Sequence, residues 1–155
     1  MPPLCYHTRM VLGVDCGDVI FYTWGGSVPG SLASLREIAA SGRFKEIHIV
    51  SKAHPVTRAI FLTRLRALDF WNYTGIPREH LHFCLHYEDK AEICAGLGVT
   101  HFVDDRLRVL QTLRTVPNRY ALREGGPRPA EIKAYASALT GVTPVNSWQE
   151  LRQLL

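Results

Sequence analysis

Short apolar runs alternate with segments of helical periodicity along most of this chain. A continuous apolar run of a few residues is typical of a strand that is buried on both faces. We expect such strands over these ranges: 10–14, 47–50, 81–85, 100–103 and 120–122. Between them, apolar residues recur at intervals of three and four, as in helices that pack on a sheet. The alternation predicts an α/β fold, a three-layer open parallel sheet with helices on both faces.

The helical pattern marks several segments, and glycines or capping residues mark some of their ends. We expect helices over these ranges: 32–39, 54–71, 90–97, 107–113, 130–139 and a terminal helix that starts at Ser147.

The longest expected helix carries two apolar stripes. One stripe contains Phe61 and Leu65, and the other contains Val56 and Ile60. One of them should meet the sheet. The other is either covered by a neighbouring element or forms a self-association surface, as in a homodimer.

The length limits the number of domains. A chain of 155 residues buries about 70% of its extended surface on folding, which supports one hydrophobic core but not two. We therefore expect a single domain over 1–155. No apolar run is long enough to span a bilayer, and Met1–Tyr6 lacks the basic and apolar pattern of a signal peptide.

The net charge is mildly positive, at +4 with a pI near 9.0. Such a balance suits anionic partners without identifying one. The arginines are scattered over the expected helices rather than interleaved with aromatic residues, so nucleic-acid binding is not favoured. The cysteines form no Cys-x-x-Cys pair and indicate reduced thiols in a cytoplasmic protein. They are Cys5, Cys16, Cys84 and Cys94.

Polar residues follow three of the expected strands. Asp15 follows the first, Ser51 and Lys52 the second, and Asp104 and Asp105 the fourth. In an open parallel sheet the carboxyl ends of the strands form the usual ligand site. Carboxylates that converge there repel one another unless they share a cation, and hard oxygen ligands favour Mg²⁺ over zinc. A hydroxyl and lysines beside that ion suit a bound phosphoryl group.

The order of these motifs resembles the haloacid dehalogenase (HAD) superfamily. That family has an Asp-x-Asp-Gly-Thr/Val segment, a strand that ends in Ser or Thr, a lysine that opens a helix, and an acidic pair after an apolar strand. Here the corresponding parts are 14–20, 49–52, Lys90 and 102–105, and they span about residues 10–110. The resemblance implies a Rossmann-like fold and a Mg²⁺-dependent phosphohydrolase or phosphotransferase.

The resemblance also implies catalytic and phosphate-binding roles. Asp15 would be the nucleophile that attacks phosphorus and forms an aspartyl-phosphate. Ser51 would hydrogen-bond the transferring phosphoryl oxygens, and Lys90 would neutralise their charge. Lys52 is either a second phosphate contact or an outward-facing surface lysine.

A metal site follows from the same resemblance. Asp105 matches the usual acidic ligand of the family and would hold Mg²⁺ together with Asp15 and the main-chain carbonyl of Gly17. Asp104 would support the site from close by.

Gly17 departs from the family pattern, because it stands where the family has its second aspartate. In HAD phosphatases that carboxylate protonates the leaving group and activates the hydrolytic water, and loss of such a group lowers a rate about 10²–10⁴-fold. We therefore expect a weak or specialised enzyme, in which Asp18 takes over or the leaving group is activated. The alternative is a non-catalytic module that binds phosphate and Mg²⁺ and acts through protein or nucleic-acid partners.

The spacing leaves no room for a sizeable cap, since only about 30 residues separate Asp15 from the second expected strand. An open site suits a macromolecular phosphorylated substrate, or a partner chain that acts as a lid. Trp24, Gly25 and Gly26 form either a small flap over the site or a plain turn.

Other chemistries fit less well. Receiver domains of two-component signalling need an acidic pair at the first strand, whereas here the pair comes last. His80, His82 and His86 could bind zinc, but no cysteine pair or further ligand completes a tetrahedron nearby, so we expect surface histidines. His54 is either an acid or base near the phosphate or a residue at the helix start.

Overall fold

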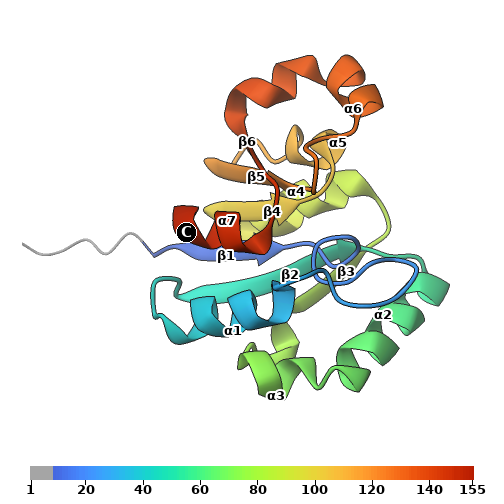
Figure 1. Cartoon of the computed structure of the whole chain (residues 1–155), viewed down its shortest axis with the longest axis vertical. Coiled ribbons are helices and arrows are strands. Elements are labelled where there is room, and N and C mark those ends of the chain that lie inside the picture. Colours follow the sequence, from blue (N-terminus) through green and yellow to red (C-terminus); the bar gives the residue numbers. More distant parts are fainter. Residues whose placement is uncertain (1–8) are drawn as a thin grey trace, which may run out of the picture.

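The computed structural model describes residues 9–155 and contains one six-stranded sheet. In spatial order the strands are β3 (Leu81–Cys84), β2 (Glu46–Lys52), β1 (Val11–Val14), β4 (His101–Asp104), β5 (Asn118–Leu122) and β6 (Val142–Val145). Every neighbouring pair is parallel. The predicted open parallel sheet is confirmed, and β1 lies between β2 and β4 (Figure 1).

Helices cover both faces of this sheet (Figure 1). One face carries α1 (Ser31–Ala40), α3 (Phe70–Thr74) and α7 (Trp148–Leu154). The other carries α4 (Tyr87–Leu97), α5 (Leu107–Leu110) and α6 (Pro129–Ala134). After β2 the chain continues into α2 (Pro55–Ala67), and two short 3-10 helices, Arg78–His80 and Ala136–Gly141, precede β3 and β6. The three-layer α/β architecture is therefore the predicted one.

The helix expected over 54–71 is two helices, so that prediction is wrong. α2 ends at Ala67, and α3 begins at Phe70. Between them Asp69 has a φ of 48°, a left-handed conformation that does not continue a right-handed helix. The turn brings Phe70 into the core, where it is fully buried, after α2 has already placed Phe61 there.

Three other elements differ from the pattern. The 107–113 segment forms only α5, and the 130–139 segment divides into α6 and a 3-10 helix. Strand β6 was not predicted, because Pro144 interrupts its apolar run and cannot donate to a sheet ladder. At the edge of the sheet, where β6 pairs with β5 alone, proline is tolerated.

The two apolar stripes of α2 have different environments. Phe61 and Leu65 are buried in the core. Val56 is 74% exposed and Ile60 is 44% exposed. Of the two alternatives for the second stripe, coverage by a neighbouring element therefore does not apply to Val56 and Ile60 within the described part of the chain.

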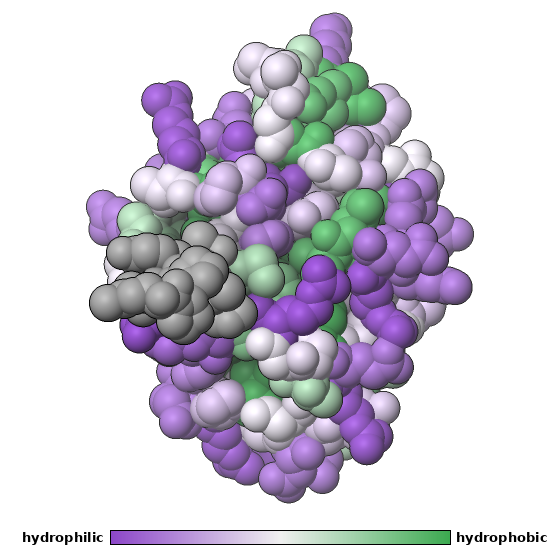
Figure 2. Space-filling model, turned by 90° about the vertical axis from the view of Figure 1, so that its left-hand side faces the viewer, coloured by the Kyte–Doolittle hydropathy of each residue, from purple (hydrophilic) through white to green (hydrophobic). Residues whose placement is uncertain are grey.

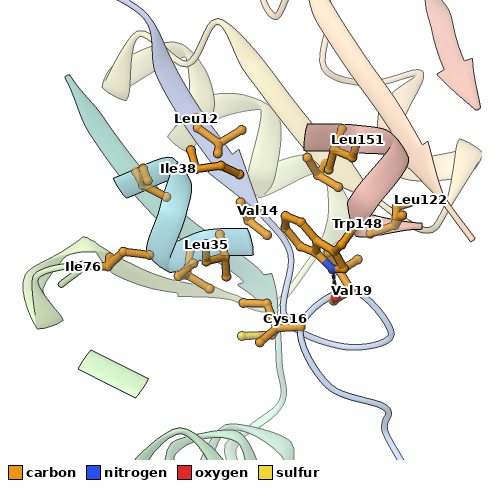
Figure 3. Close-up of a cluster of buried hydrophobic side chains, with 14 of the residues drawn as sticks. Leu12, Val14, Cys16, Val19, Leu35, Ile38, Ile76, Leu122, Trp148 and Leu151 are labelled. Carbon is orange, nitrogen blue, oxygen red and sulfur yellow. Dashed lines mark hydrogen bonds between the residues drawn. The ribbon is translucent and has the colours of Figure 1, made fainter. Parts of the chain in front are cut away.

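The terminal helix α7 closes the core beside β1. It begins as the capping pattern predicts, since Ser147 Oγ accepts a hydrogen bond from the backbone N–H of Glu150 at 3.1 Å. The fully buried Trp148 donates its indole Nε1–H to the carbonyl of Val19 at 2.8 Å (Figure 3). Because Val19 belongs to the loop that follows Asp15, α7 helps to fix the chain beside the polar strand ends.

We expect Trp148→Phe to lower the free energy of unfolding by about 1–3 kcal/mol, because the Val19 carbonyl then loses its buried partner. The phenyl ring keeps much of the packing. Leu154→Ala is the control, since Leu154 is 49% exposed on the same helix and should cost within about 0.5 kcal/mol. Urea denaturation measures both, and equal losses would contradict the role given to the indole hydrogen bond.

Two further predictions concern the state of the cysteines and the absence of a membrane span. Cys16, Cys84 and Cys94 are buried free thiols, whereas Cys5 and the segment Met1–Tyr6 lie outside the described residues. Within residues 9–155, no helix combines the length and apolar character needed to cross a membrane.

On the side where the chain enters β1, hydrophilic residues surround separate hydrophobic patches (Figure 2).

Candidate functional site

Three neighbouring strands bring their polar ends to one edge of the sheet. Asp15 directly follows β1, Ser51 and Lys52 end β2, and Asp104 ends β4 with Asp105 next to it. All of them line one cavity of about 210 Å³. The structure therefore brings these predicted site residues together, because β1 lies between β2 and β4.

Three carboxylates converge in this cavity. Asp15, Asp104 and Asp105 each offer one oxygen, and these oxygens all lie within 4.8 Å of one another. All three residues are buried. Within residues 9–155 no other set of three His, Cys, Asp or Glu side chains has this spacing. Such a cluster needs positive charge close by, because like charges in a poorly solvated site repel strongly.

Lys90 supplies one positive charge. It lies in the first turns of α4 and is only 1% exposed. Its Nζ donates to Asp15 Oδ1 at 2.9 Å and to Asp104 Oδ2 at 2.8 Å. Burial alone would lower the pKa of Lys90, but the carboxylates of Asp104 and Asp15 raise it above its usual value. The ammonium therefore stays charged in the site.

The ionised forms of the three carboxyl groups remain unfavourable despite this ammonium. Burial raises the pKa of Asp15 to about 6, although Lys90 opposes the shift, and the charge of Asp104 adds to it. Burial likewise raises the pKa of Asp104 and that of Asp105. One lysine thus does not balance the three acids.

The two adjacent aspartates have different partners. Asp104 accepts from Lys90 at Oδ2 and from the backbone N–H of Arg106, at 3.0 Å, at Oδ1. Asp105 Oδ2 accepts from Nη2 of Arg128 at 2.9 Å. Arg128 comes from the loop between β5 and α6, and the sequence pattern does not indicate it because no spacing links that loop to the acidic pair.

The donor set fits a hard divalent cation. Its candidate side-chain ligands are carboxylate oxygens, which Mg²⁺ prefers. Lys90 and Arg128 offset part of the negative charge but leave the three carboxylates in excess. Since both oxygens of Asp104 are already hydrogen-bonded, Asp15 and Asp105 have the more available oxygens.

The loop after Asp15 forms one wall of the cavity and contains Gly17 and Asp18. A Cβ on Gly17 would lie 3.4 Å from a ring carbon of Phe61 and 3.5 Å from the methyl group of Thr23, so the position has room for a side chain. Asp18 has a φ of 59°, and its Oδ1 accepts from the N–H of Thr23 at 3.2 Å. Asp18 is therefore both a turn residue and part of the cavity wall.

The segment around Trp24 is a turn that α2 holds in place. The guanidinium of Arg64 donates to the carbonyls of Tyr22 at 2.6 Å and Thr23 at 2.8 Å. Trp24 is 79% exposed and stacks on the Tyr22 ring. Thr23 lines the cavity whereas Trp24 does not, which favours the turn interpretation over a flap.

Lys52 and His54 contribute to another wall of the cavity. Lys52 Nζ lies 4.4 Å from the centre of the Tyr87 ring, and the guanidinium of Arg108 lies 5.0 Å from the same centre. Lys52 is thus a cavity residue rather than simply an outward-facing lysine. His54 is exposed and directly precedes α2, so it combines the helix-start position with a place at the cavity.

The three histidines of the zinc alternative do not gather at one point. His80 and His82 lie beside His48, whose Nδ1 is 3.0 Å from His82 Nε2 and whose ring centre is 4.2 Å from that of His80. His86 lies elsewhere, at the start of α4. Among the described residues these side chains form no three-ligand group. His86 is exposed, whereas His80 and His82 are half-buried.

The chain is similar to several solved structures. No protein-family model and no curated protein matches it. The structure of D,D-heptose 1,7-bisphosphate phosphatase from Burkholderia thailandensis superposes with a TM-score of 0.61 at 14% identity, covering 94% of this chain and 97% of that one. A structure described as a haloacid dehalogenase-like hydrolase, from Burkholderia xenovorans, gives 0.57 at 20% identity, covering 82% of this chain and 58% of that one.

A third similar structure is the cobalt-bound deoxy-D-mannose-octulosonate 8-phosphate phosphatase from Haemophilus influenzae. Its TM-score is 0.55 at 14% identity, with 96% of this chain and 88% of that chain covered. The three matches cover between 82% and 96% of this chain. The chain therefore has the fold of the HAD-like hydrolases.

Proposed function

We propose that this protein is a Mg²⁺-dependent phosphohydrolase or phosphotransferase that acts through an aspartyl-phosphate on Asp15. One observation carries the proposal, namely that the buried side chains of Asp15, Asp104 and Asp105 converge in one cavity with Lys90 hydrogen-bonded between two of them. The phosphatases among the structures of similar fold support the same reaction class.

In the proposed first step, a carboxylate oxygen of Asp15 attacks the phosphorus of a phosphate ester. The new phosphorus–oxygen bond forms as the bond from phosphorus to the leaving oxygen breaks, and the leaving oxygen departs as an anion that takes up a proton from water. Ser51, Lys52 and Lys90 bind the phosphoryl oxygens from the surrounding walls. In the second step, water attacks phosphorus, inorganic phosphate departs, and the Asp15 carboxylate is restored.

Asp15, Asp105 and the main-chain carbonyl of Gly17 would hold the Mg²⁺ ion, with Asp104 as the supporting acid. Bound there, Mg²⁺ supplies the positive charge that offsets repulsion between the nucleophile and the phosphate. Arg128 holds one oxygen of Asp105 and thereby orients the other.

An assay with 4-nitrophenyl phosphate tests this proposal. Its leaving group is activated and needs little help from a proton donor. We expect slow hydrolysis that requires Mg²⁺, stops when EDTA is added, and resumes when Mg²⁺ is supplied in excess. A rate that EDTA leaves unchanged would contradict the metal-dependent mechanism.

Gly17 is the reason for expecting a slow enzyme, and Gly17→Asp tests it. The position has room for a side chain, so we expect the variant to fold and to hydrolyse alkyl phosphates at least about 10-fold faster, since a general acid contributes about 10²–10⁴-fold. Steady-state rates on glycerol 3-phosphate measure the gain. No gain, together with a loss in Asp18→Asn, would instead assign the proton transfer to Asp18.

The absence of a carboxylate at Gly17 also favours a second function, a non-catalytic module that binds phosphate and Mg²⁺ and acts through protein or nucleic-acid partners. Calorimetric titration of Mg²⁺ and then of inorganic phosphate separates the two functions. Binding in the absence of any turnover would favour the module.

We place the protein in the cytoplasm, with a phosphorylated substrate that an uncapped site can admit even when it is macromolecular. Val56 and Ile60 form an exposed stripe on α2 that supports self-association. Light scattering on the purified protein tests this, and a monomer at high concentration would rule out the homodimer.

A further inference from the structure

A second and larger cavity adjoins the proposed phosphoryl site. Its volume is about 660 Å³, within the range of about 300–1,000 Å³ typical of small-molecule sites. Asp18 and Asp105 line both cavities, so they form the boundary between them. A substrate whose phosphoryl group lies against Asp15 can therefore extend past Asp18 into this second cavity, which is where its leaving group would lie.

Two arginines from the loop after β5 line the second cavity. Arg128 is already paired, with Asp105 at 2.9 Å and with Glu131 at 3.6 Å. Arg123 is different. It is half-buried, its one side-chain hydrogen bond within residues 9–155 goes from Nη1 to the carbonyl of Gly126 at 2.9 Å, and no described carboxylate lies within salt-bridge distance of it.

The other polar groups of this cavity are mostly engaged. Asn146 donates both its backbone N–H and its side-chain Nδ2 to Glu150, and Ser147 Oγ accepts from the backbone of the same residue. Asp18 accepts from Thr23. The guanidinium of Arg123, with five N–H donors, thus has the largest unused hydrogen-bonding capacity among the lining side chains.

The cavity also contains acidic groups, and their placement matters for the charge of the ligand. Asp105 is paired with Arg128, and Glu124 is exposed to solvent. Asp18 stands at the boundary, where the leaving oxygen would lie. Beyond that boundary Arg123 lines the cavity and forms no salt bridge with a described acid, so this end of the cavity suits an anionic group.

We propose that the substrate's leaving group carries a second anionic group, a carboxylate or a second phosphate, and that Arg123 is the specificity-determining residue that binds it. This inference rests on the proposed phosphatase function of the neighbouring site. A guanidinium binds either anion through paired N–H groups, so both chemistries are included.

Matched pairs of phosphate esters test the inference. 3-Phosphoglycerate and glycerol 3-phosphate differ by a carboxylate, and fructose 1,6-bisphosphate and fructose 1-phosphate differ by a phosphate. We expect kcat/KM to be about 10- to 100-fold higher for at least one of the two anionic members, the range expected for one charge-assisted hydrogen-bonding contact. Whichever pair shows the difference identifies the anion.

Arg123→Ala and Arg123→Gln should remove that preference and leave the rate on 4-nitrophenyl phosphate, which has no second anion, within about twofold. Arg36→Ala is the matched control, because Arg36 is an exposed arginine of α1 that stacks on Tyr73 away from both cavities. A preference that is absent from the wild-type protein, survives in Arg123→Ala, or is lost equally in Arg36→Ala would overturn the inference.

Failure of the proposed function has a different signature, because then 4-nitrophenyl phosphate is not hydrolysed either. In that case calorimetric dissociation constants for the same matched pairs, measured with Mg²⁺, decide the inference. A tighter complex with an anionic member that Arg123→Ala weakens about 10-fold would sustain it, and equal affinities would end it.

Discussion

Asp15→Asn should lower Mg²⁺-dependent hydrolysis of 4-nitrophenyl phosphate at least about 10³-fold, because the amide is a poor nucleophile and removing an enzyme's nucleophile typically has effects of this size or larger. The substitution preserves the shape of the side chain. It leaves Ser51, Lys52 and Lys90 in place, so phosphate binding should be retained better than turnover. Initial rates at saturating substrate, compared with the dissociation constant of inorganic phosphate, separate the two effects.

Folding stability provides the control for this variant. Burial raises the pKa of Asp15 to about 6, so the ionised carboxylate is disfavoured in the folded state. The contribution of Asp15 to the free energy of unfolding therefore decreases as the pH rises from the pKa of this residue in the unfolded chain to about 6. At pH 7.5 without Mg²⁺, a neutral asparagine should therefore be at least as stable as the wild type. A variant that is well folded and keeps a tenth of the wild-type rate would contradict the nucleophile assignment.

Lys90→Met should reduce the free energy of unfolding by about 3–5 kcal/mol, the usual effect of removing one partner from a buried ion pair. The ammonium donates to Asp15 and Asp104 at 2.9 and 2.8 Å, and all three residues are buried. Methionine fills a similar volume but leaves two carboxylates facing each other. Urea denaturation at pH 7.5 measures the loss, and the same variant should show no turnover.

Two further variants make this stability prediction specific. Lys133→Met removes an exposed lysine of α6 and should change stability by within about 0.5 kcal/mol. The double variant Lys90→Met with Asp104→Asn should recover part of the loss, because one of the unpaired acids is gone. A loss below about 1 kcal/mol for Lys90→Met alone would show that the carboxylates do not depend on this ammonium.

Several of the candidate site residues could be identified from the sequence, and the reason is physical. In a parallel sheet the polar residue that ends a buried strand must lie at the carboxyl edge, so Asp15, Ser51 and Asp104 share that edge once their strands are neighbours. Lys90 could be placed on a helix beside them only through the motif order, because helical periodicity does not distinguish a buried lysine from an exposed one.

The features that the sequence pattern does not reveal lie in loops and at the edge of the sheet. Arg128 reaches Asp105 from a loop more than twenty positions away, and no periodicity encodes that contact. Strand β6 contains Pro144, which is compatible with a strand only at an edge. The break between α2 and α3 depends on the left-handed Asp69, whereas the apolar pattern continues through it.

A crystal structure of the protein grown with Mg²⁺ and beryllium fluoride tests the central claim most directly. Beryllium fluoride takes the place of a phosphoryl group on a carboxylate. The account predicts a tetrahedral adduct on a carboxylate oxygen of Asp15, with Lys90 and Ser51 in contact with its fluorides and a metal ion between Asp15 and Asp105. An adduct on another residue would contradict it. So would Mg²⁺ bound away from Asp15 in a structure in which every residue of the cavity is ordered.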